Sequence, residues 1–224
     1  MKKLWIFGDS FSDISGLWEG QPYYTEYCKQ NPEFKQGTVL KGWYDYLAKS
    51  LNCKLVKFSF PGGSNEVIMR SVLNNLQYIS KDDIIIIGWT RPTRFSIPIL
   101  SGYQQFTSIQ NDGSSRLIDK EYNLNDSLNS YYKNIFVPNV DNYVNTWINN
   151  INEFSNYLNQ NFNFKSWTWW DIPHESIIEH FNNVHDNHPS VNGHYQIFEA
   201  ISNMKIGSMC DWDEYTSSNK NHWD

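Results

Sequence analysis

The feature of this sequence that most limits its fold is an uninterrupted run of isoleucines at positions 84–87. A continuous β-branched run indicates a strand buried on both faces, as in a parallel sheet. Apolar segments at residues 4–7, 54–58 and 164–170 predict three further strands. Together they favour a mainly parallel central sheet of about five strands.

Amphipathic helical patterns alternate with these strands. Apolar residues recur at helical spacing within residues 43–51, 68–79, 143–158 and 191–204. Such alternation predicts an α/β fold, a three-layer α/β/α sandwich with right-handed connections. Ligands of such sheets bind beyond the carboxyl ends of the strands. The 224 residues suit a single domain, which we expect over residues 1–206.

Two segments fall outside the alternation. Residues 95–139 show no sustained period and are rich in Ser, Asn, Gly and Asp, which predicts an insert. The insert is expected to act as a lid or to shape the substrate site, and to contain a short hairpin around residues 111–113. The alternative is a surface decoration without function. Residues 207–224 are expected to form a C-terminal tail that packs as an arm or frays.

Composition excludes several classes of protein. A net charge of −6 without a basic stripe argues against a nucleic-acid partner. No stretch approaches the roughly 20 apolar residues of a membrane span, and the apolar run after the first lysines is too short for a signal peptide. Three cysteines without metal-ligand spacing favour a reduced compartment and no metal site. A cytoplasmic protein is expected, and a viral source stays open.

Four polar blocks accompany the predicted strands and the last helix. They are Gly8-Asp9-Ser10-Phe11-Ser12, Pro61-Gly62-Gly63-Ser64-Asn65, Gly88-Trp89-Thr90-Arg91 and Asp186-Asn187-His188-Pro189. In this order, over residues 2–201, the blocks resemble the SGNH, or GDSL, esterase family. The resemblance implies a flavodoxin-like SGNH hydrolase fold and a serine hydrolase without cofactor or metal.

The resemblance assigns the nucleophile to Ser10 and the base to His188. A serine hydroxyl is a weak nucleophile and needs a base that a third group orients. The alternative for Ser10 is a helix cap. The family's Asp-x-x-His spacing is absent, because His185 stands three residues before His188. Asp186, two residues before it, would lie on the same face if the segment were extended, and it is the expected orienting acid.

Other residues are also candidates for the group that orients the His188 imidazole. If Asp186 only forms a turn or cap before Pro189, a backbone carbonyl or another carboxylate, such as Asp171 or Glu175, must hold the imidazole. His185 and His194 are expected at surface and helix positions, and His174 remains ambiguous.

The oxyanion hole also departs from the family pattern. The resemblance implies donors from the Ser10 N–H and from Gly62 or Gly63, although a Gly-Gly pair also marks a tight turn. Thr90 stands where the family has an asparagine, so the Thr90 hydroxyl or the Asn65 amide is the expected substitute.

Three residues near the third block are expected to contact substrate: Trp89, Arg91 and Arg94. A guanidinium there can hold an anionic substrate group or buttress a carboxylate, because arginine makes planar bidentate pairs. A solvated surface pair is the alternative.

The resemblance thus implies a metal-independent esterase that acts on a small-molecule or glycan ester through an acyl-enzyme on Ser10. Short-chain acyl groups, including O-acetyl groups on carbohydrate, are the expected substrates. The shortened Asp–His spacing and the missing asparagine keep a second interpretation open, an SGNH-fold binding or structural module such as a glycan binder. A nucleotide or phosphate binder is disfavoured, because no glycine-rich phosphate loop follows the first strand.

Overall fold

The computed structural model of the protein describes residues 1–14, 22–34, 39–92, 94–99, 102–107, 116–117, 139–168 and 188–212. They form an α/β fold around a parallel sheet with the strand order β2-β1-β3-β7. The strands are β1 (Lys3–Gly8), β2 (Lys54–Ser59), β3 (Ile84–Trp89) and β7 (Asn163–Thr168). All four coincide with predicted strands, and among the described residues this sheet has four strands rather than five.

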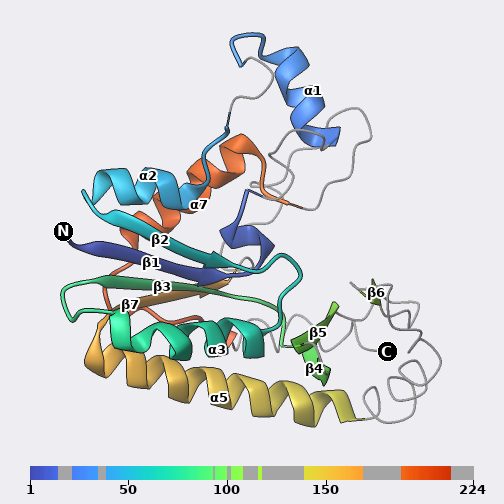
Figure 1. The fold of residues 1–224 in the computed structure, drawn as a ribbon, viewed down its shortest axis with the longest axis vertical. Helices are drawn as coiled ribbons and strands as arrows, with labels where there is room; N and C mark the ends of the chain where they lie inside the picture. Colours follow the sequence, from blue (N-terminus) through green and yellow to red (C-terminus); the bar gives the residue numbers. More distant parts are fainter. Residues whose placement is uncertain are drawn as a thin grey trace.

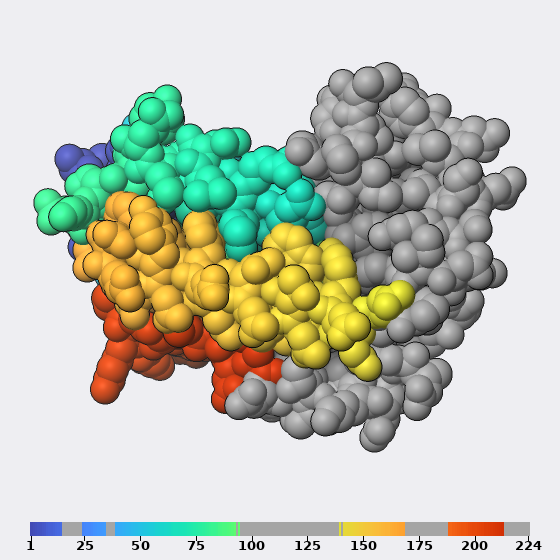
Figure 2. Space-filling view, turned by 90° about the horizontal axis from the view of Figure 1, so that it is seen from below, coloured from blue at the N-terminus to red at the C-terminus, as the bar shows by residue number. Residues whose placement is uncertain are grey.

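Helices cover both faces of the sheet (Figure 1). On one face lie α2 (Trp43–Ser50) and α7 (Val191–Asn203), and on the other α3 (Asn65–Asn75) and α5 (Val140–Asn161). Figure 2 shows α3 and α5 side by side on their face. The arrangement is compatible with a three-layer α/β/α sandwich. Within the described part of the chain, no helix is both long and apolar enough to cross a bilayer.

The isoleucine run supplies both hydrophobic cores. Ile84 and Ile86 pack in the core under α2 and α7, whereas Ile85 and Ile87 pack in the core under α3 and α5. Successive side chains of a strand point to opposite faces. A central strand with helices on both sides therefore needs an apolar residue at every position.

One helix was not expected from the sequence. This helix, α1 (Pro22–Gln30), contributes Tyr24 to a small apolar cluster that also contains Leu40, Ile14 and Val191. Through Val191, α1 packs beside the start of α7. Two short 3-10 turns, η1 (Ser10–Ser12) and η2 (Leu76–Tyr78), follow β1 and α3.

The predicted insert contains regular structure. Strands β4 (Phe95–Ile99), β5 (Gly102–Thr107) and β6 (Arg116–Leu117) form an antiparallel sheet in that order. The pairing of β5 with β6 brackets the expected hairpin, but residues 111–113 themselves lie outside the described residues. In Figure 1, β4 and β5 lie beyond the carboxyl ends of the parallel strands.

The first part of the expected tail packs against the sheet. The Gly207 N–H donates to the Phe164 carbonyl at 2.8 Å, and the Ser166 N–H donates to the Ser208 carbonyl at 3.0 Å. Trp212 is buried in the core under α3 and α5. These contacts cover part of the edge of β7, which protects an otherwise open strand. Residues 213–224 lie outside the described residues.

Candidate active site

The strand order reverses between β1 and β3, which are neighbours in the sheet. From β1 the chain continues to β2 on one side, and from β3 it later reaches β7 on the other side. At such a switch point the loops diverge and leave a crevice beyond the carboxyl ends of the strands. Ser10 follows β1 and Thr90 follows β3, so both residues lie at this end of the sheet.

Ser10 begins the short turn η1 but does not serve as its side-chain cap. The N-cap is Asp9, whose carboxylate accepts the Phe11 N–H at 2.9 Å. Ser10 is 4% exposed, and no hydrogen bond joins its hydroxyl to a described residue. Because Asp9 caps the turn, the Ser10 hydroxyl is left for another role.

An ion pair holds the residue before Ser10. The second carboxylate oxygen of Asp9 accepts a hydrogen bond from Arg94 Nη1 at 3.0 Å. The two side chains are 2% and 16% exposed, so the pair is largely withdrawn from water. Of the two roles expected for an arginine here, the observed contact is the support of a carboxylate.

A second ion pair holds the other end of η1. Asp13, the C-cap of the turn, pairs with Lys57 of β2, and Lys57 also donates to the Tyr44 hydroxyl at 3.1 Å. Burial raises the pKa of Tyr44, and the charge of Asp13 raises it further, so Tyr44 is a neutral phenol at pH 7. Ser10 therefore sits in a turn anchored at both ends, which favours a fixed position for its hydroxyl.

His188 lies close to the same turn. Its ring centroid is 6.2 Å from that of Phe11, the residue next to Ser10. Two residues later, Ser190 caps α7 by accepting the Gly193 N–H at 2.8 Å. The fold thus brings the first and last polar blocks to one end of the sheet. Asp186 and the alternatives for its role, which are Asp171, His174, Glu175 and His185, lie outside the described residues.

His194 lies on α7, as expected, but it is fully buried rather than exposed. Burial lowers its pKa to about 3, and the charge of Lys57 adds to this effect. Its Nδ1 accepts the Trp43 N–H at 3.3 Å, which puts the proton of the neutral ring on Nε2. That Nε2 has no hydrogen-bond partner among the described residues.

The two candidate oxyanion glycines form a tight turn. The Gly63 N–H donates to the Phe60 carbonyl at 2.7 Å, and Gly62 has a φ of 74°. Pro61 followed by a glycine with positive φ is typical of a type II turn. The Gly63 N–H is therefore committed to the turn, whereas the Gly62 N–H makes no hydrogen bond to a described residue.

Asn65 and Thr90 are joined by two reciprocal hydrogen bonds. The Asn65 amide donates to the Thr90 carbonyl, and its oxygen accepts the Thr90 N–H, both at 2.8 Å. Asn65 thus fixes the backbone after β3, a role that sequence reasoning did not anticipate. Both residues are buried, and the Thr90 hydroxyl has no partner among the described residues.

The remaining predicted substrate contacts differ in exposure. Trp89 is 1% exposed and packs edge-on against Phe154 in the core under α3 and α5. Arg91 is half-buried. Of these two residues, only Arg91 therefore offers appreciable surface for a ligand.

Buried polar atoms without partners gather at this end of the sheet. Within the described region they include Ser12 Oγ, Thr90 Oγ1 and Arg94 Nε. Such atoms are uncommon in native structures, and strain, a catalytic role or a bound water or ion can each account for them. No group of three His, Cys, Asp or Glu side chains among the described residues could hold a metal ion.

The chain was also compared with known proteins, and it matches no family model and no curated protein. The functional argument therefore depends on the fold and on the contacts around Ser10.

Proposed function

We propose that the protein is a serine esterase of the SGNH/GDSL type, which hydrolyses short-chain carboxylic esters, with O-acetyl groups on carbohydrate among its candidate substrates. The observation that carries the proposal is the proximity of the serine and histidine blocks. The His188 ring lies 6.2 Å from the ring of Phe11, which adjoins Ser10. This proximity occurs at the end of the sheet where ligands of such folds bind.

In the proposed reaction, Ser10 Oγ attacks the ester carbonyl while His188 takes its proton. His188 then returns the proton to the departing alcohol, leaving an acyl group on Ser10. Water, deprotonated by His188, releases the carboxylate and regenerates Ser10. Asp186 orients the imidazole. The Ser10 and Gly62 N–H groups and the Thr90 hydroxyl are the proposed oxyanion donors, since Gly63 and Asn65 already donate elsewhere.

The anchoring of η1 supports this proposal. The Asp9–Arg94 pair and the Asp13–Lys57 pair hold the turn on both sides of Ser10. A nucleophile must keep a near-attack geometry, and a misplacement of about 1 Å can lower the rate about a hundredfold. Ion pairs on both sides of a short turn are a physical means of keeping that geometry.

The test is hydrolysis of p-nitrophenyl acetate with a chelator present. Ser10→Ala is expected to lower kcat/KM by roughly a thousandfold or more, because the nucleophile is removed. The matched control is Ser12→Ala in the same turn, which removes a hydroxyl without a described partner and is expected to keep kcat/KM within about threefold. Equal turnover by the wild type and Ser10→Ala would contradict the proposal.

A second candidate function is a binding module with the same fold. It is favoured by the commitment of the Gly63 N–H and the Asn65 amide to local structure. Loss of one oxyanion donor typically lowers the rate by about 10²–10³, so an oxyanion hole with fewer donors would leave little catalysis. The binding module predicts no ester turnover by a folded wild type, together with glycan binding that Ser10→Ala retains.

A further inference from the structure

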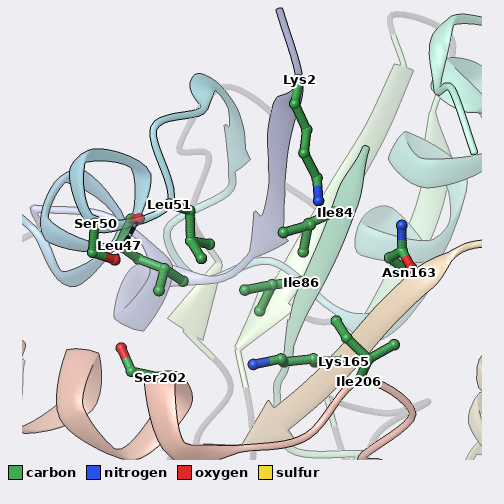
Figure 3. Close-up of a pocket in the computed structure, with 10 residues that line it drawn as sticks. All are labelled: Lys2, Leu47, Ser50, Leu51, Ile84, Ile86, Asn163, Lys165, Ser202 and Ile206. Carbon is green, nitrogen blue, oxygen red and sulfur yellow. Dashed lines mark hydrogen bonds between the residues drawn. The ribbon is translucent and has the colours of Figure 1, made fainter. Parts of the chain in front are cut away.

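A pocket of about 260 Å³ is drawn in Figure 3. Its lining residues lie toward the amino ends of the parallel strands, whereas Ser10 follows the carboxyl end of β1. The pocket is bounded by the amino ends of β1, β3 and β7 and by the last turns of α2 and α7. Much of its wall is aliphatic, from Leu47, Leu51, Ile84, Ile86 and Ile206. No residue of the candidate active site lines it.

Two lysines add positive charge to this aliphatic pocket. Lys165 reaches from β7 toward Ser202, and Lys2 extends over Ile84 (Figure 3). Lys165 is half-buried, and its Nζ donates to the Ile201 carbonyl at 3.1 Å near the end of α7. An ammonium group has three donors, so two remain for a ligand.

The charge of Lys165 lacks a carboxylate partner among the described residues. Burial lowers the pKa of its ammonium group, as expected for a charge partly withdrawn from water. An anion bound beside such an amine would stabilise its charged form. The aliphatic wall would at the same time take an alkyl chain out of water.

We propose that this pocket binds a linear alkanoate of about six to eight carbons, with its carboxylate on Lys165 and its chain against Leu51 and Ile206, the exposed apolar residues of the lining. The volume of about 260 Å³ equals roughly nine water volumes of about 30 Å³ each, which limits the ligand to a short chain. The Lys2 ammonium lies over Ile84 and adds a second positive charge. This site is separate from the proposed ester-cleaving site and does not depend on it.

The test is calorimetric titration of the full chain with hexanoate and with its neutral counterpart hexanol. Lys165→Met keeps an unbranched side chain, one heavy atom shorter, and removes the charge. It is expected to weaken hexanoate binding about tenfold, the usual worth of a charge-assisted hydrogen bond, and hexanol binding by less than about twofold. The matched control is Lys49→Met, an exposed lysine of α2 that does not line the pocket, which should bind as the wild type does.

A second variant fills the pocket. Ile206 is 50% exposed, so Ile206→Trp is expected to keep the fold and to abolish binding of both ligands. The proposal is overturned if the wild type does not bind hexanoate, or if hexanol binds as tightly as hexanoate. It is also overturned if hexanoate binds Ile206→Trp as it binds the wild type. The last comparison decides the question even if Lys165→Met fails to fold.

Discussion

Arg94 acts on the candidate nucleophile through one intermediate side chain. It neutralises Asp9, whose other oxygen caps the turn that begins with Ser10. The two residues are 85 positions apart in the sequence. A change at residue 94 therefore tests whether the ion pair positions Ser10 or whether the guanidinium binds substrate.

We expect Arg94→Met to lower kcat for p-nitrophenyl acetate at least about tenfold with little change in KM, because the turn loses its anchor. The free energy of unfolding, measured with urea, should fall by about 3 kcal/mol, since the Asp9 charge stays buried without a partner. Arg70→Met removes the more exposed pair with Glu66 on α3 and should cost less than about 1 kcal/mol. A rise in KM confined to anionic esters would identify Arg94 as a substrate contact instead.

The burial of His194 leads to a separate prediction about how the free energy of unfolding depends on pH. Its pKa in the folded protein is about 3, below the ordinary value of 6.5, mainly because it is buried. As pH falls below 6.5, the unfolded chain binds a proton at this residue and the folded chain does not. Stability from this residue is therefore fully present above about pH 6.5 and is lost progressively toward about pH 3, by up to about 1.4 kcal/mol per pH unit.

Urea unfolding between about pH 6.5 and pH 5, above the range of ordinary carboxylates, measures this dependence. We expect His194→Gln to flatten the slope of unfolding free energy against pH by about 0.7 kcal/mol per unit at pH 6.5, rising toward about 1.4 kcal/mol per unit at pH 5, whatever its stability at pH 7. Identical slopes for the two proteins would show that His194 titrates in the folded state.

Among the elements, η1 packs closely on the end of β3. A Cβ added at Gly88 would lie 2.6 Å from Ser12 Oγ and 3.1 Å from Trp167 Nε1. A side chain at residue 88 would therefore have to displace the Ser12 hydroxyl of η1 and would crowd the Trp167 ring. Glycine at this position is explained by the close approach of the turn.

We expect Gly88→Ala to lower the free energy of unfolding by about 1–3 kcal/mol, the usual cost of overpacking. Ser12→Ala should be nearly neutral, because its hydroxyl has no partner among the described residues. The double variant should recover at least about 0.5 kcal/mol relative to the sum of the single changes. Strict additivity in urea unfolding would show that Ser12 does not cause the strain.

The parallel strands and four of the helices could be predicted because side-chain periodicity is a local property. The antiparallel sheet was missed although Phe95, Ile97 and Ile99 alternate with other residues in β4. Pro98 within this stretch argues against a central strand, but β4 is an edge strand of its sheet and tolerates it. Whether a strand lies at an edge is decided by its partners and not by its own residues.

Over the whole molecule, the polar residues around Ser10 and the largely aliphatic pocket lie at opposite ends of the parallel sheet. The carboxyl ends carry Ser10 and the residues that anchor its turn, and the amino ends carry the pocket around Lys165. Two cores on opposite faces of the sheet join these ends. Both sites therefore rest on the same strands but use different loops and helix ends.

By itself, the sequence determined the strands and helices around the sheet and the end to which Ser10 belongs, because periodicity is local and parallel strands share their carboxyl edge. Only the tertiary structure decided that Asn65 bonds to Thr90, that Arg94 pairs with Asp9 and that His194 is buried. The physical reason is distance along the chain. Hydrogen bonds, ion pairs and burial depend on which groups meet in space, and these partners lie 25 and 85 residues apart.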